Sequence, residues 1–356
     1  MLAVVVITAV TAAPAFADSI RDQQWHLSYL HVTDAQKISQ GAGVVVGVAD
    51  VGVDPSAPEL ASAVVAGKDF GRAGDGRSDT DGHGTAMAGL IAGRGNGGND
   101  GALGIAPKAT IVPLRVAPSL DFGGNSANLA AALEWAAVNG VKVVCIALSA
   151  AEDEQIRTAV QNALDADIVV VAAAGNLPDN KKIAYPARAP GVLAVGGIDR
   201  QGRHAEISTT GSEVAIAAPA VDIVSTNIEK GYRKGTGTSD AAAIVAGAAA
   251  LVRAKYPQLS AQDVIRRLTY TAQDAGAPGR DPEYGYGILD LVKALTAEVP
   301  PASPGATPQA SASAEPGKNA GGEHSVAVIA AVGAAVVVVV FISVLQSIIR
   351  GRRRRG

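Results

Sequence analysis

The chain has 356 residues, of which 48% are hydrophobic and 4% aromatic, and its formal net charge at pH 7 is −3. A charge this close to zero gives no sign of a nucleic-acid partner, and no residue pattern calls for a cofactor. Cys145 is the only cysteine, so the chain cannot form an internal disulfide. Because Cys145 lies in an apolar run, we expect a buried structural thiol rather than a reactive one.

The N-terminal stretch has the features of an export signal. Residues 1–17 are apolar and end in the small-x-small pattern Ala15-Phe16-Ala17, which is typical of a secretory signal peptide. The usual Lys or Arg near the start is missing, so either the signal is weak or the true start lies upstream of Met1. An uncleaved membrane anchor is the alternative, although the run is short for a membrane span. Residues 18–40 follow as a mixed polar extension, for which a surface helix is one interpretation.

Residues 41–296 alternate short apolar runs with helical stretches, and they are numerous enough for one domain with a large core. The expected strands are 44–49, 111–116, 141–148, 168–174, 192–196 and 214–217. The expected helices are 126–139, 152–166, 240–255 and 261–271. Nearly continuous Val, Ile and Ala strands that alternate with helices indicate an α/β fold with a doubly wound, mostly parallel sheet and helices on both faces. In such open sheets, ligands bind beyond the carboxyl ends of the strands.

Three polar residues occupy the ends of these elements. Asp50 ends the first apolar run, His83 lies between glycines at a helix start, and Ser239 lies on a glycine-rich turn before an alanine-rich helix. A serine with a histidine base and an orienting carboxylate is the set that nucleophilic catalysis needs. Each residue alone also has a structural interpretation, with Ser239 as a helix N-cap, Asp50 as a turn cap and His83 as an ordinary loop histidine.

The order Asp, His, Ser along the chain is that of the subtilisins. Two stretches resemble the histidine and serine motifs of the subtilisin-like serine proteases (subtilases): His83-Gly84-Thr85 with Ala88-Gly89, and Gly237-Thr238-Ser239 with Ala241-Ala242. The run from Val169 to Asn176 resembles the strand of that family which ends in the oxyanion asparagine. The resemblance covers roughly residues 41–295 and therefore the whole predicted domain.

This resemblance implies a serine endopeptidase that hydrolyses polypeptides. Ser239 would be the nucleophile, His83 the general base and Asp50 the acid that orients it. Asn176 would donate to the oxyanion together with the Ser239 amide. The implied substrate-binding residues, along which the substrate would lie as an added β-strand, are Gly123, Gly124, Leu148, Ser149 and Gly175.

Several positions depart from the family pattern. Val51 follows the acid where Ser or Thr is usual, Ser149 replaces a glycine of the cleft wall, and Ala243 replaces a proline. We expect the Ser149 side chain to narrow the specificity, and it leaves room for a weak protease. Loop acids that precede His83 could suggest a cation site, but such carboxylates are usually solvated, so no metal site is predicted; these acids are Asp75, Asp79 and Asp81.

The C-terminal part has a different composition. Residues 297–324 form a Pro-, Ala-, Ser- and Gly-rich linker. Residues 325–349 form an apolar run that is long enough for a transmembrane helix. The basic tail, residues 350–356, predicts a cytoplasmic C-terminus and a peptidase domain on the extracytoplasmic side. We therefore expect a single-pass protein of the cell membrane.

This order of segments resembles the mycosins, the membrane-anchored subtilases of type VII secretion systems. In those proteins an N-terminal extension packs along the catalytic domain. The resemblance implies a membrane-anchored endopeptidase that works with a type VII secretion membrane complex. A weakly active or inactive protease-like subunit that stabilises such a complex is the alternative. Mycosins typically carry disulfides, which this chain cannot make, so it would be a divergent member.

Overall fold

The computed structural model describes residues 20–97, 100–120 and 124–300. The chain divides into two units, Met1–Pro301 and Ala302–Gly356, and all described residues belong to the first. The predicted signal peptide, membrane helix and basic tail lie outside the described residues, as do Gly123 and most of the predicted linker. Within the described ranges, no helix combines the length and the apolar character needed to cross a membrane.

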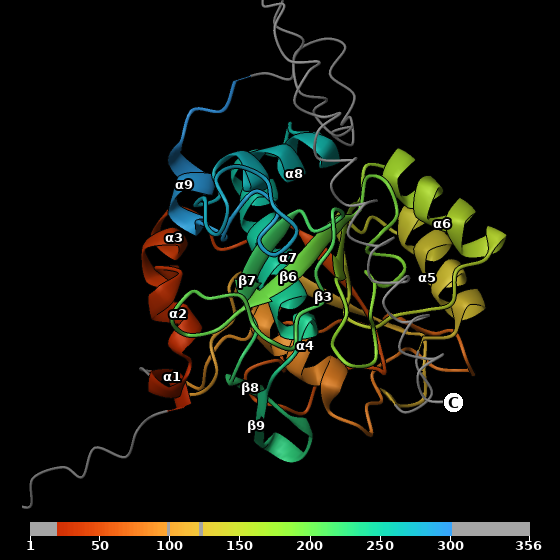
Figure 1. The fold of residues 1–356 in the computed structure, drawn as a ribbon. Helices are drawn as coiled ribbons and strands as arrows, with labels where there is room; N and C mark the ends of the chain where they lie inside the picture. The colour runs from red at the N-terminus through yellow and green to blue at the C-terminus, as the bar shows by residue number, and fades with distance from the viewer. Residues whose placement is uncertain (1–19, 98–99, 121–123, 301–356) are drawn as a thin grey trace, which may run out of the picture. The chain divides into compact units, whose positions relative to one another are not determined.

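The centre of the described unit is a parallel sheet in the order β2-β3-β1-β4-β5-β6-β7 (Figure 1). Its strands are β1 (Val45–Asp50), β2 (Lys68–Asp69), β3 (Thr110–Arg115), β4 (Val143–Ile146), β5 (Val169–Ala173), β6 (Leu193–Ile198) and β7 (Ile216–Pro219). A separate antiparallel hairpin consists of β8 (Ile223–Thr226) and β9 (Tyr232–Gly235).

Helices cover both faces of the sheet. They are α1 (Ile20–Gln23), α2 (Trp25–Tyr29), α3 (Val32–Ile38), α4 (His83–Ala92), α5 (Ser126–Val138), α6 (Glu154–Asp165), α7 (Thr238–Lys255), α8 (Ala261–Tyr270) and α9 (Leu291–Thr296), with a short 3₁₀ turn η2 (Ile228–Lys230). Every residue from Thr238 to Arg253 is buried, so α7 is apolar all round and runs through the core. Figure 1 shows α5 and α6 side by side, away from α2 and α3.

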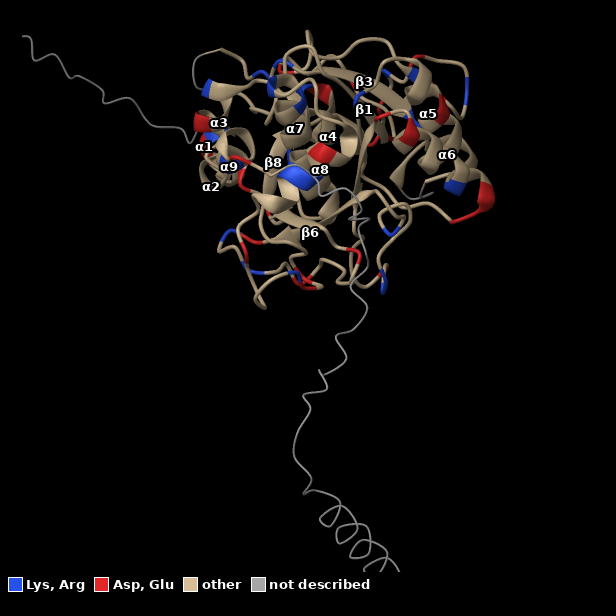
Figure 2. Cartoon of the chain, turned by 90° about the horizontal axis from the view of Figure 1, so that it is seen from above, with Lys and Arg blue, Asp and Glu red and all other residues tan. Residues whose placement is uncertain are grey.

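Strand side chains alternate between two cores, as expected for a sheet covered on both sides. In β4, Val143 and Cys145 enter the core that contains α4 and α7, whereas Val144 and Ile146 enter the core that contains α5 and α6. Cys145 is buried and free, as predicted. Acidic and basic residues are interspersed around the described unit (Figure 2), in keeping with its near-neutral net charge.

The predicted strands and helices of residues 41–296 are present, with ends that agree to within about two residues. The predicted α/β architecture with a mostly parallel sheet is therefore confirmed. The sequence did not indicate β2, α9 or the β8–β9 hairpin.

The extension is more than a surface helix. Its three short helices bury Trp25 and His26, and Trp25 Nε1 donates to the Val221 carbonyl at 3.0 Å. Near the end of the extension, Ser39 Oγ donates to the Leu251 carbonyl at 2.8 Å. The interpretation as a surface helix is therefore wrong, because the extension packs along the domain through buried side chains.

Candidate active site

The end of β1 and the start of α4 bring a carboxylate and an imidazole together. His83 Nδ1 lies 2.9 Å from Asp50 Oδ1 and 2.9 Å from Oδ2. Asp50 is fully buried, and its Oδ1 also accepts a hydrogen bond from the Val51 amide at 2.8 Å. Because a carboxylate only accepts, Nδ1 must carry the proton, which leaves Nε2 as the basic nitrogen.

The charge of Asp50 controls the protonation of His83. Burial alone would lower the pKa of the imidazole, but the charge and hydrogen bond of Asp50, aided by the charge of Asp240, outweigh burial and raise that pKa. This is the arrangement that holds a histidine in one tautomer and stabilises its protonated form during proton transfer.

Local features of the chain explain why these two residues meet. Gly84 has no side chain, and a Cβ there would collide with the carbonyl oxygen of Gly52, so α4 can approach the end of β1 only with glycine at this position. Asp79 caps the start of α4, because its carboxylate accepts hydrogen bonds from the Gly82 amide at 2.8 Å and from the Thr85 amide at 3.0 Å.

The loop acids that precede His83 make contacts of their own. Of the loop acids, Asp79 is occupied as a helix cap, and Asp75 pairs with Arg77 at 2.6 Å. Among the described residues, no group of three or more His, Cys, Asp or Glu side chains is arranged to hold a metal ion.

Asn176 and Ser239 meet at the start of α7. Asn176 Oδ1 accepts hydrogen bonds from the Thr238 amide at 2.9 Å and the Thr238 hydroxyl at 3.0 Å. This fixes the carboxamide, so that its Nδ2 is free to donate elsewhere. A Cβ placed on Gly237 would lie 3.0 Å from Ser239 Oγ and 3.3 Å from Asn176 Nδ2, so both groups border the same small space.

Gly175 belongs to this arrangement through its backbone. Its amide donates to Thr238 Oγ1 at 3.1 Å, and its φ of +109° lies in the region that favours glycine. The Asn176 amide in turn donates to Asn180 Oδ1 at 3.2 Å. The loop after β5 is therefore held against the residue that precedes Ser239.

Ser239 is 9% exposed, and its hydroxyl makes no hydrogen bond within the described residues. The structure therefore places His83 and Ser239 at the starts of two packed helices, α4 and α7, without a direct hydrogen bond between their side chains. Such bonds are often long in a free enzyme and tighten when substrate binds.

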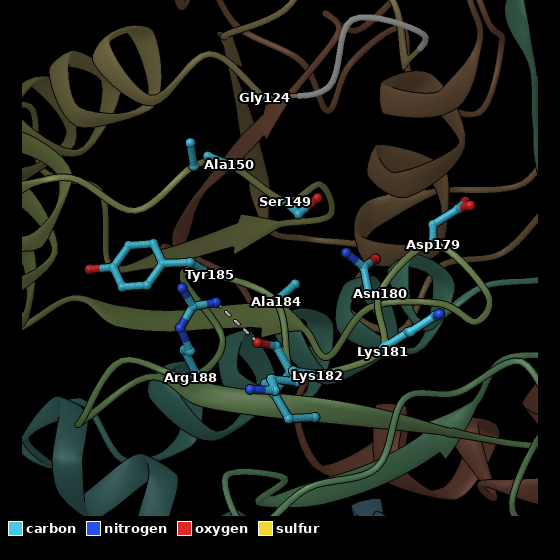
Figure 3. Close-up of a pocket in the computed structure, with 12 residues that line it drawn as sticks. Gly124, Ser149, Ala150, Asp179, Asn180, Lys181, Lys182, Ala184, Tyr185 and Arg188 are labelled. Carbon is cyan, nitrogen blue, oxygen red and sulfur yellow. Dashed lines mark hydrogen bonds between the residues drawn. The ribbon is translucent and has the colours of Figure 1, made fainter.

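The two predicted edges of the cleft contact each other in this structure. The Gly124 amide donates to the Ser149 carbonyl at 2.9 Å, and Leu148 Cδ1 packs against the same glycine. A recess of about 580 Å³ opens beside them (Figure 3). It is lined by Gly124, Ser149, Ala150, Ala151, Ile183, Ala184, Tyr185, Arg188 and the loop 179–182.

The sequence analysis gave no role to Asp240, the residue after Ser239. It is 4% exposed, and its carboxylate makes no hydrogen bond within the described part of the chain. Burial raises the pKa of Asp240 to about 7, although His83 and Arg233 both act to lower it. The only signal for Asp240 in the sequence was its position next to the predicted nucleophile, and no signal in the sequence indicated a role for Arg233.

Comparisons with known proteins identify the family of this chain. A family model described as Peptidase_S8, the subtilase family, matches residues 41–287. Subtilisin DY from Bacillus licheniformis is 38% identical over 256 residues, which cover 71% of this chain and 90% of that protein. Mycosin-1 from Mycobacterium tuberculosis is 37% identical over 338 residues, with 79% of this chain and 74% of that protein covered.

Two solved structures also resemble this chain. The crystal structure of MycP1 with its N-terminal propeptide removed has a TM-score of 0.67 and 32% identity, and the match covers 78% of this chain and 98% of that chain. The structure of the MycP3 protease from the type VII (ESX-3) secretion system has a TM-score of 0.65 and 34% identity, over 77% of this chain and 88% of that chain.

Proposed function

The chain belongs to the subtilase family of serine-type endopeptidases and is related to the mycosins of type VII secretion, and we propose that it is a membrane-anchored, extracytoplasmic peptidase with the triad Asp50, His83 and Ser239. The observation that carries this proposal is the contact of both Asp50 oxygens with His83 Nδ1 at 2.9 Å.

The proposed reaction is acyl transfer through a serine ester. His83 Nε2 takes the proton of Ser239 Oγ as that oxygen attacks the peptide carbonyl, and then returns the proton to the leaving amine. Asp50 holds the imidazole in the required tautomer and stabilises the imidazolium. Asn176 Nδ2 and the Ser239 amide donate to the oxyanion, because they border the space beside Gly237 where it would form.

The substrate is proposed to be an extended polypeptide that lies along the cleft edges as an added strand. The recess beside Ser149 is large enough for a side chain of that substrate. At Gly124 the backbone amide already donates to the Ser149 carbonyl. A substrate strand must therefore either start beyond this pair or displace its hydrogen bond, which would lower the affinity for peptides.

Membrane anchoring is proposed from the sequence outside the described residues. Residues 325–349 are apolar, and the arginines of 350–356 follow at once. The relatives MycP1 and MycP3 are described as parts of type VII secretion systems. On this basis we propose association with a type VII secretion membrane complex. We also propose a signal peptide at 1–17, from the apolar run that ends in Ala15-Phe16-Ala17.

The second candidate is a weakly active or inactive subunit that stabilises a secretion complex. Two observations favour it: the Ser239 hydroxyl has no hydrogen bond with His83, and the cleft edges contact each other at Gly124 and Ser149. Both proposals share the fold, so only the reactivity of Ser239 separates them.

A fluorophosphonate probe tests that reactivity, since it labels only an activated serine. We expect the full chain in detergent to be labelled, whereas the Ser239→Ala and His83→Ala variants are not. Absence of labelling in a well-folded parent would contradict the free-standing peptidase and favour the subunit. Labelling in the His83→Ala variant at the parent rate would contradict the triad.

A further inference from the structure

Asn180 lies in the loop that follows β5, and it lines the recess beside Ser149 (Figure 3). Its amide donates to the Asn176 carbonyl at 2.8 Å, its Oδ1 accepts from the Asn176 amide at 3.2 Å, and its carbonyl accepts from the Thr209 hydroxyl at 2.6 Å. A Cβ placed on Gly175 would lie 2.8 Å from Asn180 Cβ, so the side chain also packs against that glycine. These contacts fix the position of the Asn180 carboxamide.

The contact with Asn176 also fixes which end of the Asn180 carboxamide is bound. A backbone amide only donates, so the atom that it meets must be the oxygen Oδ1. The nitrogen Nδ2 carries two donors and makes no hydrogen bond within the described residues. Figure 3 shows this nitrogen at the end of the carboxamide that is turned towards Ser149 and Ala184. A fixed, unbound donor therefore faces the recess.

The backbone groups around the recess are already paired. The Gly124 amide donates to the Ser149 carbonyl at 2.9 Å, and the Ala150 amide donates to the Tyr185 carbonyl at 3.0 Å. The Ser149 hydroxyl is on an exposed residue and makes no hydrogen bond in the described part of the chain. The uncharged polar groups left to meet a ligand are thus Ser149 Oγ and Asn180 Nδ2, and both can donate to an oxygen.

The charged residues of the recess favour an anion. Arg188 is balanced, because it donates to the Glu152 carboxylate at 2.6 Å. Lys181 and Lys182 are exposed, and neither makes a salt bridge with another described residue. Asp179 is the one carboxylate among the lining residues. With two unpaired ammonium groups against one carboxylate, the rim of the recess carries an excess of positive charge.

The recess adjoins the place where the proposed reaction occurs. Asn176 Nδ2 and Ser239 Oγ border the same space, since a Cβ on Gly237 would lie 3.3 Å from the first and 3.0 Å from the second. Asn180 is bound to Asn176 through both of its hydrogen bonds with that residue. A peptide whose carbonyl lies beside Ser239 therefore has the recess next to the side chain that precedes the cleaved bond.

We propose that Asn180 is a specificity-determining residue, whose Nδ2 donates to a carboxylate in the substrate side chain that occupies the recess. The proposal rests on the proposed function, because it names the substrate class of that site: polypeptides with Glu or Asp before the cleaved bond. Hydrogen bonds to a charged acceptor are stronger than those to a neutral one. A Gln side chain meets the same donor without the charge, and a Leu side chain leaves the donor unpaired. The expected order of preference is Glu, then Gln, then Leu.

The experiment measures kcat/KM of the full chain in detergent for peptides that differ only in the residue before the cleaved bond, which is Glu, Gln or Leu. We expect the parent to prefer the Glu peptide over the Leu peptide about tenfold, as one hydrogen bond to a charged group allows. Asn180→Asp keeps an oxygen for the Asn176 amide but replaces the donor with a second carboxylate oxygen. The Glu-to-Leu ratio should then fall to one or below, while the Leu peptide is cleaved as by the parent. A parent without the preference, or an Asn180→Asp variant that keeps it, overturns the proposal.

Lys181→Gln is the matched control for the change of charge. Like Asn180→Asp, it makes the same loop more negative by one unit, but it leaves the Asn180 carboxamide intact. We expect this variant to keep most of the preference for Glu. A loss as large as that in Asn180→Asp would mean that the net charge of the loop selects the substrate, and it would overturn the role of Asn180.

A second measurement separates this proposal from the proposed function. Ser239→Ala lacks the proposed nucleophile, so calorimetry can measure how tightly it binds the same peptides. Tighter binding of the Glu peptide, lost when Asn180→Asp is added, is the expected result even if the parent does not react with the fluorophosphonate probe. Equal binding of the Glu and Leu peptides, or no binding of either, overturns the role of Asn180 whether or not the parent is active.

Discussion

The carboxamide of Asn176 is bound to Thr238, the residue before Ser239, through a hydrogen bond of 2.9 Å from the Thr238 amide to Asn176 Oδ1. The acceptor half of the side chain is thereby occupied, and its donor half faces the space that Ser239 Oγ also borders. A donor fixed before the reaction starts needs no reorganisation when negative charge develops, and this is what makes such groups effective.

The first prediction therefore concerns Asn176. We expect Asn176→Leu to lower kcat for a peptide substrate by about 10²–10³, the range found when this kind of oxyanion donor is removed in a subtilisin. The variant also loses the bond to Thr238, so its thermal unfolding must be measured alongside. Thr238→Val removes the hydroxyl contact but keeps the amide, so a much smaller loss is expected. Equal losses in the two variants would show that Asn176 acts by holding the loop.

The second prediction concerns Gly237, whose missing side chain would leave room for the proposed oxyanion. A methyl group there would lie 3.0 Å from Ser239 Oγ and 3.3 Å from Asn176 Nδ2. We expect Gly237→Ala to abolish probe labelling while the unfolding temperature stays close to that of the parent, because the methyl group would fill the reaction space. Gly231→Ala is the control, since its new methyl group meets no atom closer than 3.4 Å. Normal labelling of Gly237→Ala would show that the oxyanion forms elsewhere.

The third prediction concerns Arg115, which supports the loop after Asp50. Its guanidinium donates to Asp69 Oδ2 at 2.7 Å and to the Val51 carbonyl at 2.8 Å, and both members of the ion pair are buried. We expect Arg115→Met to lower the free energy of unfolding by about 3–5 kcal/mol, because Asp69 is left buried without its main partner. Denaturant titration of parent and variant measures the loss.

Arg72→Gln is the matched control for that prediction, since Arg72 pairs with the same carboxylate at 3.1 Å but is largely exposed. Its loss should stay below about 1 kcal/mol. If the two variants lose the same stability, burial of the Arg115–Asp69 pair is not what stabilises this part of the fold.

The motifs predicted candidate site residues because functional groups of an open sheet sit at strand ends and helix starts, where the local sequence is distinctive. His83 and Asn176 each stand next to a glycine in such a place, and Asp50 stands two residues before one. The structure brings Asp50 to His83 as the family resemblance implies. Gly124 and Ser149 could be placed on the cleft edges in the same way. The hydrogen bond between Gly124 and Ser149 could not be predicted, because it depends on how two loops approach each other.

The charged groups that act on His83 could not be predicted from the sequence, for a related reason. Arg233 lies on β9, in the hairpin that β8 and β9 form ahead of α7, and neither strand has a strong alternation of apolar and polar residues. Asp240 stands beside Ser239, the proposed nucleophile, in the sequence, but its burial follows from the packing of α7. Charges that act through space leave no periodic pattern to detect.

The last prediction concerns His26 in the extension, which is fully buried on α2. Neither of its ring nitrogens has a partner among the described residues. Burial lowers the pKa of His26 from 6.5 to about 3. The folded protein therefore holds a neutral imidazole at pH values where the unfolded chain binds a proton. Stability is fully present above about pH 6.5 and falls as the pH decreases towards 3, by about 1.4 kcal/mol per unit.

We expect the parent to lose about 2 kcal/mol more unfolding free energy between pH 7 and pH 5 than the His26→Leu variant. Other titrating groups, including His83, remain in both proteins, so the difference isolates His26. His31→Asn is the control, because His31 is exposed and its left-handed backbone suits asparagine. Denaturant titration of the full chain at both pH values decides the question. Equal pH dependence in parent and His26→Leu would mean that the extension opens at little cost and lets His26 bind a proton before the domain unfolds.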